Sequence, residues 1–386
     1  MLLGVLVALF VLSVGVALVR RQLDRQRRDA AALAQRSRVL YELAEGDQHH
    51  VAAELERVCE GSPSDPSVFL ALAAIDRGRG RIERAKAIHR TVLASAELAH
   101  EQRVVALVGL GRDLLAEGNV AAAVGALNRA TSLAPSSLAT LESLAEALDR
   151  AGAWERAAAV WERVEKQAGG RRARGAKVGR GRALAGQAIE AHGSGETEKA
   201  GKLVQRAHEL APGSGYVSTV VARIKAARGG GRPHDVLLSW QRAWELSSGG
   251  AAPVVAEAVA WADAHGHADA LLERMRASLR ATQDPDLVVT LALAAAKHDA
   301  VLARSALQRV AGRSLAARWE LLCMALAADD RETAEFAVAA GPSAPRLTCR
   351  VCGVRLQRFA FRCPSCSSWE SVIGDAGGFA DGPRSH

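Results

Sequence analysis

Residues 107–135 have the sequence LVGLGRDLLAEGNVAAAVGALNRATSLAP, and this stretch decides the fold. Apolar and small residues recur at spacings of three and four on both sides of Gly118, and Pro135 ends the run. A helix places residues three and four apart on one face, so the stretch predicts two short amphipathic helices joined by a tight turn. The two predicted faces contain Leu107, Leu110, Gly111 and Leu114, then Ala123, Leu127 and Ala130.

The same pattern recurs about 34 residues later, which is the period of tetratricopeptide repeats. The second copy contains Leu141, Leu144, Ala145, Leu148, Gly152, Ala157, Trp161 and Val164. An upstream copy contains Phe69, Leu72, Ala73, Gly80, Ala85, His89 and Val92. A downstream copy follows the insertion GGRRARGAK and contains Leu184, Ala188, Gly195, Ala200, Val204, Ala207 and Pro212.

This recurrence predicts an all-α protein built as a tetratricopeptide-repeat solenoid over residues 35–340. Weaker copies occur at residues 41–63 and 217–246, and the helical pattern continues past Pro253 although the repeat signature fades. A generic Ala/Leu-rich helical bundle is the alternative, but it does not require a fixed period of small residues and turn glycines.

The composition of the 386-residue chain agrees with tight helix packing. Hydrophobic residues make up 49% and aromatic residues only 4%, and the net charge is +8. A basic chain binds nucleic acid, binds an anionic membrane surface, or simply carries arginine on solvated helix faces. No basic stripe with interleaved aromatic residues is present, so we expect no nucleic-acid partner.

The N-terminus predicts a membrane anchor. Residues 1–19, MLLGVLVALFVLSVGVALV, contain no charged side chain and form a helix of about 28 Å, close to the ~30 Å hydrocarbon core. A cleaved signal peptide would have basic residues before the apolar run and a small-residue cleavage site after it. Here a basic juxtamembrane segment, residues 20–34, follows instead, and the positive-inside rule places the rest of the chain on the cytoplasmic side. Its membrane-surface residues are Arg20, Arg21, Arg25, Arg27 and Arg28.

Four cysteines near the C-terminus predict a metal site. Their spacing is Cys349-x2-Cys352-x10-Cys363-x2-Cys366, and two C-x-x-C turns present four thiolates to one ion. We therefore expect a metal-binding domain over residues 346–374, with one iron or zinc ion, followed by a flexible tail at residues 375–386. Phe359, Phe361 and Trp369 are the candidates for its small core.

The remaining cysteines and polar residues suggest no chemistry. Cys59 and Cys323 lie singly in helical patterns, and we expect them to be buried. No H-E-x-x-H, G-x-S-x-G or dinucleotide glycine motif is present, so we expect no enzyme. A repeat solenoid has a concave groove, and four polar residues off the core face are candidates to line it, although a plain solvated surface is equally compatible. These candidates are Arg112, Glu142, Glu146 and Asp149.

Anchor, repeats and terminal cysteines in this order resemble the lipopolysaccharide assembly protein B family of Gram-negative bacteria. The resemblance is most specific in two places: residues 77–118, with Ile88-His89, Glu101-Gln102-Arg103 and Gly111-Arg112-Asp113, and the ending CRVCG…FRCPSCSSW. The second is similar to the family's rubredoxin-like domain. The insertion after Ala168 and the glycines at 229–231 depart from the family pattern.

The resemblance implies a non-enzymatic inner-membrane adaptor that regulates lipopolysaccharide synthesis. Such an adaptor is expected to present an LpxC-like lipid A deacetylase to an FtsH-like membrane protease, with other lipopolysaccharide assembly proteins and a second copy of the chain as further partners. Two alternatives stay open: an anchored repeat scaffold for another envelope complex, and a rubredoxin-type electron carrier.

Overall fold

The computed structural model describes residues 57, 66–96, 98–229, 232–247, 249–328, 330, 333, 346–349, 351, 354–356, 363–365, 369 and 372–375. The chain divides into two compact units, Met1–Asn119 and Val120–His386. The predicted anchor, the juxtamembrane arginines, the repeat at 41–63 apart from Arg57, and the tail at 375–386 apart from Asp375 lie outside the described residues. Among the described residues, no helix has both the length and the apolar character that a membrane span requires.

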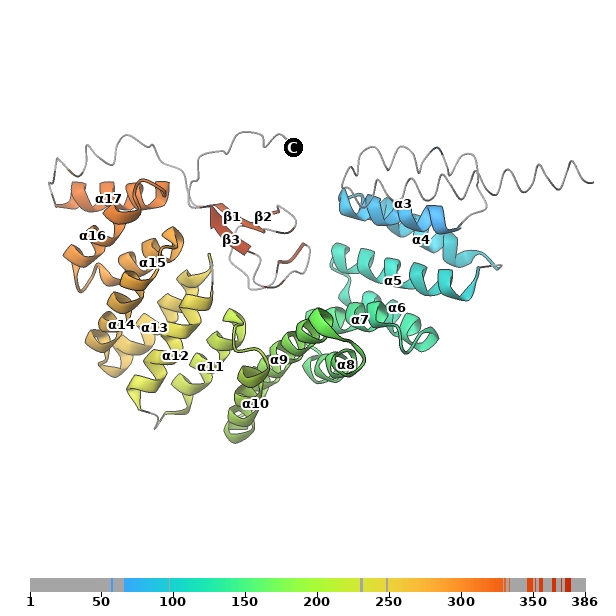
Figure 1. Cartoon of the computed structure of the whole chain (residues 1–386), viewed down its shortest axis with the longest axis horizontal. Helices are drawn as coiled ribbons and strands as arrows, with labels where there is room; N and C mark the ends of the chain where they lie inside the picture. The colour runs from blue at the N-terminus through green and yellow to red at the C-terminus, as the bar shows by residue number, and fades with distance from the viewer. Residues whose placement is uncertain are drawn as a thin grey trace, which may run out of the picture. The chain divides into compact units, whose positions relative to one another are not determined.

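The first unit contains three described helices, α3 (Pro66–Gly78), α4 (Ile82–Ala94) and α5 (His100–Glu117) (Figure 1). Helix α3 packs on α4, and α4 packs on α5. The predicted turn glycine Gly80 has φ 77°, in the left-handed region that favours glycine. Small residues at the α3–α4 crossing, Ala73 and Ala85, are fully buried, as the repeat pattern predicts.

A buried polar cluster joins the three helices of this unit. His89 Nδ1 lies 2.6 Å from Asp113 Oδ2, and Arg77 Nη1 donates to Asp113 Oδ1 at 3.0 Å. The imidazole lies over Gly109, where an added Cβ would be only 2.1 Å from His89 Nε2. A glycine is therefore required at 109 so that His89 can reach the carboxylate.

The second unit continues the helix pairs (Figure 1). Its helices are α6 (Val120–Leu133), α7 (Leu138–Arg150), α8 (Trp154–Gln167), α9 (Gly170–Gly193), α10 (Thr197–Leu210), α11 (Gly215–Arg228), α12 (Pro233–Leu246), α13 (Ala251–His265), α14 (Ala268–Ala281), α15 (Pro285–Ala295), α16 (Ala300–Val310) and α17 (Leu315–Ala327). Ser137, Ser214 and Ser314 cap the starts of α7, α11 and α17 by accepting a backbone N–H three residues later. The all-helical solenoid is thus confirmed, and it extends beyond Pro253, where the sequence signature fades.

The predicted insertion GGRRARGAK is part of a helix. Helix α9 begins at Gly170 and runs for 24 residues, because the added residues lengthen the helix instead of forming a loop. Its glycines leave room for two indoles of α8. A Cβ at Gly179 would lie 2.6 Å from Trp161 Cε2, and one at Gly186 would lie 2.3 Å from Trp154 Cδ2. Without side chains at these positions, α8 and α9 pack closely.

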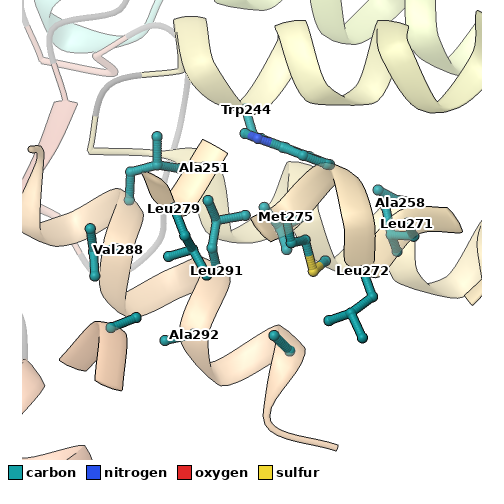
Figure 2. Close-up of a cluster of buried hydrophobic side chains, with 14 of the residues drawn as sticks. Trp244, Ala251, Ala258, Leu271, Leu272, Met275, Leu279, Val288, Leu291 and Ala292 are labelled. Atoms are coloured by element: carbon teal, nitrogen blue, oxygen red, sulfur yellow. The ribbon is translucent and has the colours of Figure 1, made fainter. Parts of the chain in front are cut away.

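The largest hydrophobic cluster lies where the repeat signature is weakest. It runs from α11 to α17, and Figure 2 shows part of it, including Trp244, Met275, Leu279, Val288 and Leu291. The Trp244 indole is completely buried, and its Nε1 donates to Ser278 Oγ at 3.1 Å. These large side chains, together with the alanines between them, form the core of the C-terminal repeats.

A small antiparallel sheet follows α17. Its strands are β1 (Arg346–Cys349), β2 (Arg355–Leu356) and β3 (Val372–Asp375), in the order β2-β1-β3. Leu347 pairs with Leu356 on one side of β1 and with Gly374 on the other. The sheet brings together the beginning and end of the predicted metal-binding domain at residues 346–374, and it extends one residue beyond that domain, to Asp375.

Candidate partner surface and metal-binding module

The first predicted metal ligand lies at the end of a strand. Cys349 ends β1, is 1% exposed, and donates its backbone N–H to Val354 O at 3.0 Å, which closes a tight loop. Val351 N donates to Cys349 Sγ at 3.4 Å. Backbone N–H groups directed at sulfur tune metal-bound thiolates, so this loop fits a metal-binding knuckle.

The second half of the predicted site also has a buried cysteine next to a turn. Cys363 is fully buried and is followed by an exposed turn at Pro364 and Ser365. Cys352 and Cys366 lie outside the described residues, and within the described ones no group of three or more potential metal ligands occurs. A set of four thiolates suits zinc or iron, and the burial of Cys349 and Cys363 fits such a set. Because the other two cysteines are not described, the site stays a prediction.

Among the other cysteines, the prediction for Cys323 is wrong. Its side chain is exposed on α17. Buried residues of that helix, such as Leu321 and Ala325, occupy the core-facing positions instead. Cys59 lies outside the residues that the structure describes.

The C-terminal module contacts three helices of the solenoid. Trp369 lies against Tyr216 of α11, with ring centroids 5.0 Å apart and planes inclined by 50°. The guanidinium of Arg182 in α9 lies over the Trp369 ring, 4.7 Å from its centroid. Arg150, at the end of α7, donates to Pro364 O. We call Arg150, Arg182 and Tyr216 the docking surface.

The sequence predicts that Trp369 belongs to the small core of its own domain. In the structure its ring contacts the solenoid. An aromatic pair contributes about 0.5–1.5 kcal/mol beyond its buried area, and a cation–π contact about 0.5–2 kcal/mol. Burial raises the pKa of the Tyr216 phenol to about 12; the nearby Arg223 opposes this shift, and the Asp149 carboxylate adds to it. A charged phenolate is thus unfavourable under the docked module.

The sequence contains no periodic signal for the docking surface. Arg150 ends α7, Arg182 lies in the middle of α9, and Tyr216 is near the start of α11. The three residues occupy different positions in their repeats, so the comparison of repeats does not identify them. They become neighbours only because successive helices are offset in the solenoid.

Two of the four predicted groove residues lie partly or fully at the surface of α7. Glu142 accepts two hydrogen bonds from Arg172 of α9, Nε to Oε1 and Nη2 to Oε2, both 2.9 Å. Glu146 is exposed. A similar bidentate pair joins Arg223 of α11 to Glu257 of α13, at 2.7 and 2.6 Å. These pairs bridge alternate helices of the solenoid, and their planar fork geometry fixes the orientation of each side chain.

The prediction for Asp149 is wrong, because this residue belongs to the core. Its side chain is 3% exposed, and Oδ2 accepts a hydrogen bond from Trp161 Nε1 at 3.1 Å. An indole N–H that is buried against Gly179 needs an acceptor, and Asp149 supplies it. Arg112 is exposed on α5 of the first unit, whereas the other three residues belong to the second unit.

Comparisons with known proteins confirm the resemblance over part of the chain. No family model matches. The chain is 28% identical over 160 residues to lipopolysaccharide assembly protein B of Escherichia coli strain K12, and equally to that of Escherichia coli O157:H7. The alignment covers 42% of this chain and 40% of the relative, so the chain spans less than half of the length of the curated relatives that it matches.

Solved repeat proteins are also similar. A MamA double mutant has a TM-score of 0.37 at 17% identity, with 47% of this chain and 93% of that chain covered. YrrB, described as a TPR protein with an unusual peptide-binding site, has a TM-score of 0.35 at 16% identity, with 45% and 83% covered. The helix pairs form a tetratricopeptide-repeat-like solenoid, and 160 residues of the chain are similar in sequence to lipopolysaccharide assembly protein B.

Proposed function

We propose that this chain is a non-enzymatic, membrane-anchored adaptor that acts in lipopolysaccharide assembly. The similarity to lipopolysaccharide assembly protein B over 160 residues is the observation that carries this proposal. A repeat solenoid supports it physically, because stacked helix pairs present an extended surface suited to protein segments.

The partner surface in this proposal combines the solenoid and the C-terminal module. Trp369 rests on Tyr216 and Arg182, so the module covers part of the surface formed by α7, α9 and α11. A partner that recognises both parts gains contacts that neither part provides alone. Docking also orders the module before the partner arrives, which lowers the entropic cost of binding.

The client that we propose is an LpxC-like deacetylase, delivered to an FtsH-like protease in the inner membrane. The predicted anchor at residues 1–19 and the arginines after it hold the adaptor at the cytoplasmic surface of that membrane. Tethering a client beside a membrane protease raises its effective concentration without any new contact.

The metal would have a structural role in this adaptor. Cys349, Cys352, Cys363 and Cys366 would hold one iron or zinc ion, and a closed tetrathiolate site supplies folding energy rather than an open catalytic position. About 30 residues bury too little apolar surface to fold alone, so the ion would keep the module in the shape that docks on Tyr216.

The test follows the half-life of the deacetylase in cells with and without this protein. Depletion should lengthen the half-life severalfold, and the wild-type gene should restore it. A Cys349→Ser/Cys352→Ser double variant should fail to restore it, whereas Cys323→Ser should succeed. Cys323 is a matched control because it is an exposed cysteine outside the predicted ligand set.

An unchanged half-life after depletion would remove the lipid A assignment and leave an anchored scaffold for another envelope complex. Full restoration by the double cysteine variant would exclude the metal module from the mechanism. A reversible visible spectrum of an iron-loaded chain, together with an unchanged half-life, would favour the electron carrier instead.

A further inference from the structure

A cavity of about 730 Å³ lies between α10, α11 and α12. Its walls come from two repeats, and none of its lining residues belongs to the docking surface. Part of the wall is apolar, with Val204, Val221, Ile224 and Leu238 among the lining residues. Leu238 is 47% exposed, so this part of the apolar wall is accessible to a bound group.

Two buried polar groups at this cavity have no hydrogen-bond partner in the protein. Ser218 is 2% exposed, and its Oγ is unpaired. Its neighbour Thr219 and the facing Ser239 instead donate to carbonyl groups four residues earlier, at 2.8 Å each. The Nδ1 atom of His208 is also buried and unpaired. Both residues line the cavity, so their remaining hydrogen-bonding capacity is available to a bound molecule.

Cationic side chains surround the same space. Lys225, Arg228 and Arg242 line the cavity, and Asp235 is the one carboxylate among the lining residues. The guanidinium of Arg228 lies beside Gly201, where an added Cβ would be 2.2 Å from Nη1. No carboxylate pairs with Arg228 among the described residues.

The charges of these cations affect the pKa of His208. Burial lowers the pKa of His208, and the charges of Arg242 and Lys225 lower it further, against the weaker effect of Glu209. Lys225 Nζ donates to Ser239 Oγ at 2.9 Å, and Arg242 Nη2 donates to Pro212 O at 3.3 Å. Both bonds are to neutral acceptors, so the positive charge of the cavity is not neutralised by them.

We propose that this cavity binds a phosphate monoester that carries a small apolar group. A phosphate dianion matches the excess of cations over the single carboxylate, and guanidinium groups bind phosphate in a planar, bidentate geometry. Ser218 Oγ donates to a phosphate oxygen, and His208 Nδ1 accepts or donates according to its tautomer. The apolar group covers Leu238 and Val221. This site is independent of the proposed adaptor function.

The experiment uses the full 386-residue chain in lipid nanodiscs, with empty nanodiscs as the blank. Phosphorus NMR relaxation measures binding of butyl phosphate, inorganic phosphate and glucose 1-phosphate. Butyl phosphate should bind about tenfold more tightly than inorganic phosphate, because methylene groups leave water. A lipid-like source is supported if butyl phosphate also binds better than glucose 1-phosphate. Equal affinity for the two esters would overturn the apolar part of the proposal.

Matched variants then locate the site. Arg228→Gln and Leu238→Glu should each weaken butyl phosphate binding by about fivefold or more, since one removes a cation and the other adds a carboxylate. Asp235→Asn should strengthen it severalfold. Arg206→Gln removes the same charge from α10 at a residue outside the cavity lining and should have no effect.

Both exposed positions, Arg228 and Leu238, tolerate change without loss of folding, which a thermal melt of each variant verifies. Undiminished binding by both variants, or a failure of all three phosphates to bind, would overturn the proposal. The opposite effects expected for Arg228→Gln and Asp235→Asn separate an electrostatic site from general destabilisation.

Discussion

The ring of Trp369 packs on the ring of Tyr216, 5.0 Å between centroids, and thereby holds the C-terminal module against α11. The two residues are far apart in sequence, and Arg182 of α9 covers the same indole. Together with the hydrogen bond from Arg150 to Pro364 O, these contacts attach the module to the repeats.

Replacing Trp369 by alanine should release the module from the solenoid. Loss of the aromatic and cation–π contacts costs about 1–3 kcal/mol, which raises the undocked fraction about 5- to 150-fold. Hydrogen exchange should become faster in β1, β3 and the first turn of α11. Trp319→Ala is the control, because Trp319 is a partly exposed indole on α17, outside the docking surface. Equal exchange in the two variants would contradict the docking role.

The ionisation of Tyr216 should report docking directly. Its pKa is raised from 10.0 to about 12, so the phenol is neutral in both folded and unfolded chains below pH ~10. Between these values the unfolded chain ionises first, and the contribution of Tyr216 to stability is lost as the pH rises. The chain has two tyrosines, so an ultraviolet titration in a Tyr41→Phe background observes Tyr216 alone.

In that background, Trp369→Ala should lower the pKa of Tyr216 toward 10, because solvent reaches the phenol once the indole is gone. An unchanged titration would mean that the solenoid alone buries Tyr216.

The contact between Gly179 and Trp161 should make this glycine irreplaceable. Gly179→Ala places a Cβ 2.6 Å from the indole, and overpacking of this kind costs about 1–3 kcal/mol. Gly175→Ala lies in the same helix but meets nothing within 4 Å, so it should gain up to about 1 kcal/mol of helix propensity. Thermal melts should therefore shift in opposite directions. A higher melting temperature for both variants would show that Trp161 moves aside freely.

Asp149 should act as a structural acceptor and not as a partner-binding residue. Asp149→Ala leaves the buried Trp161 Nε1 without its acceptor, at a cost of about 1–3 kcal/mol. Glu146→Ala, on the exposed face of the same helix, should change stability by less than about 0.5 kcal/mol. Denaturant unfolding measures both. If Asp149→Ala left the free energy of unfolding unchanged, Asp149 would again be a candidate for the groove.

The helix pairs were predictable because repeat packing is local. Small residues at each crossing and a glycine in each turn recur with the repeat, and Gly118, Gly152 and Gly195 adopt positive φ angles of 91°, 69° and 82° in the structure. The continuation past Pro253 was visible only as helical periodicity. There large side chains such as Met275 and Leu291 pack with many buried alanines, so a continuous core is preserved although the repeat motif is not recognisable.

The candidate site was predictable only where chemistry fixes the spacing. Two C-x-x-C pairs predict a metal site from their spacing, and the burial of Cys349 and Cys363 is compatible with this prediction. Surface and core positions on α7 were harder to separate. Asp149 has a polar side chain that sequence patterns assign to solvent, but the indole of Trp161 on the next helix requires a buried acceptor.

The sequence by itself determined the repeat period, the turn glycines and the cysteine spacing, because each depends on contacts within one repeat or one short loop. Only the tertiary structure decided that Trp369 meets Tyr216 and Arg182, and that Ser218 and His208 share a cationic cavity. Within each set, the groups come from different helices or from the C-terminal module. Their proximity depends on how successive helices stack in three dimensions, and no local pattern encodes that offset.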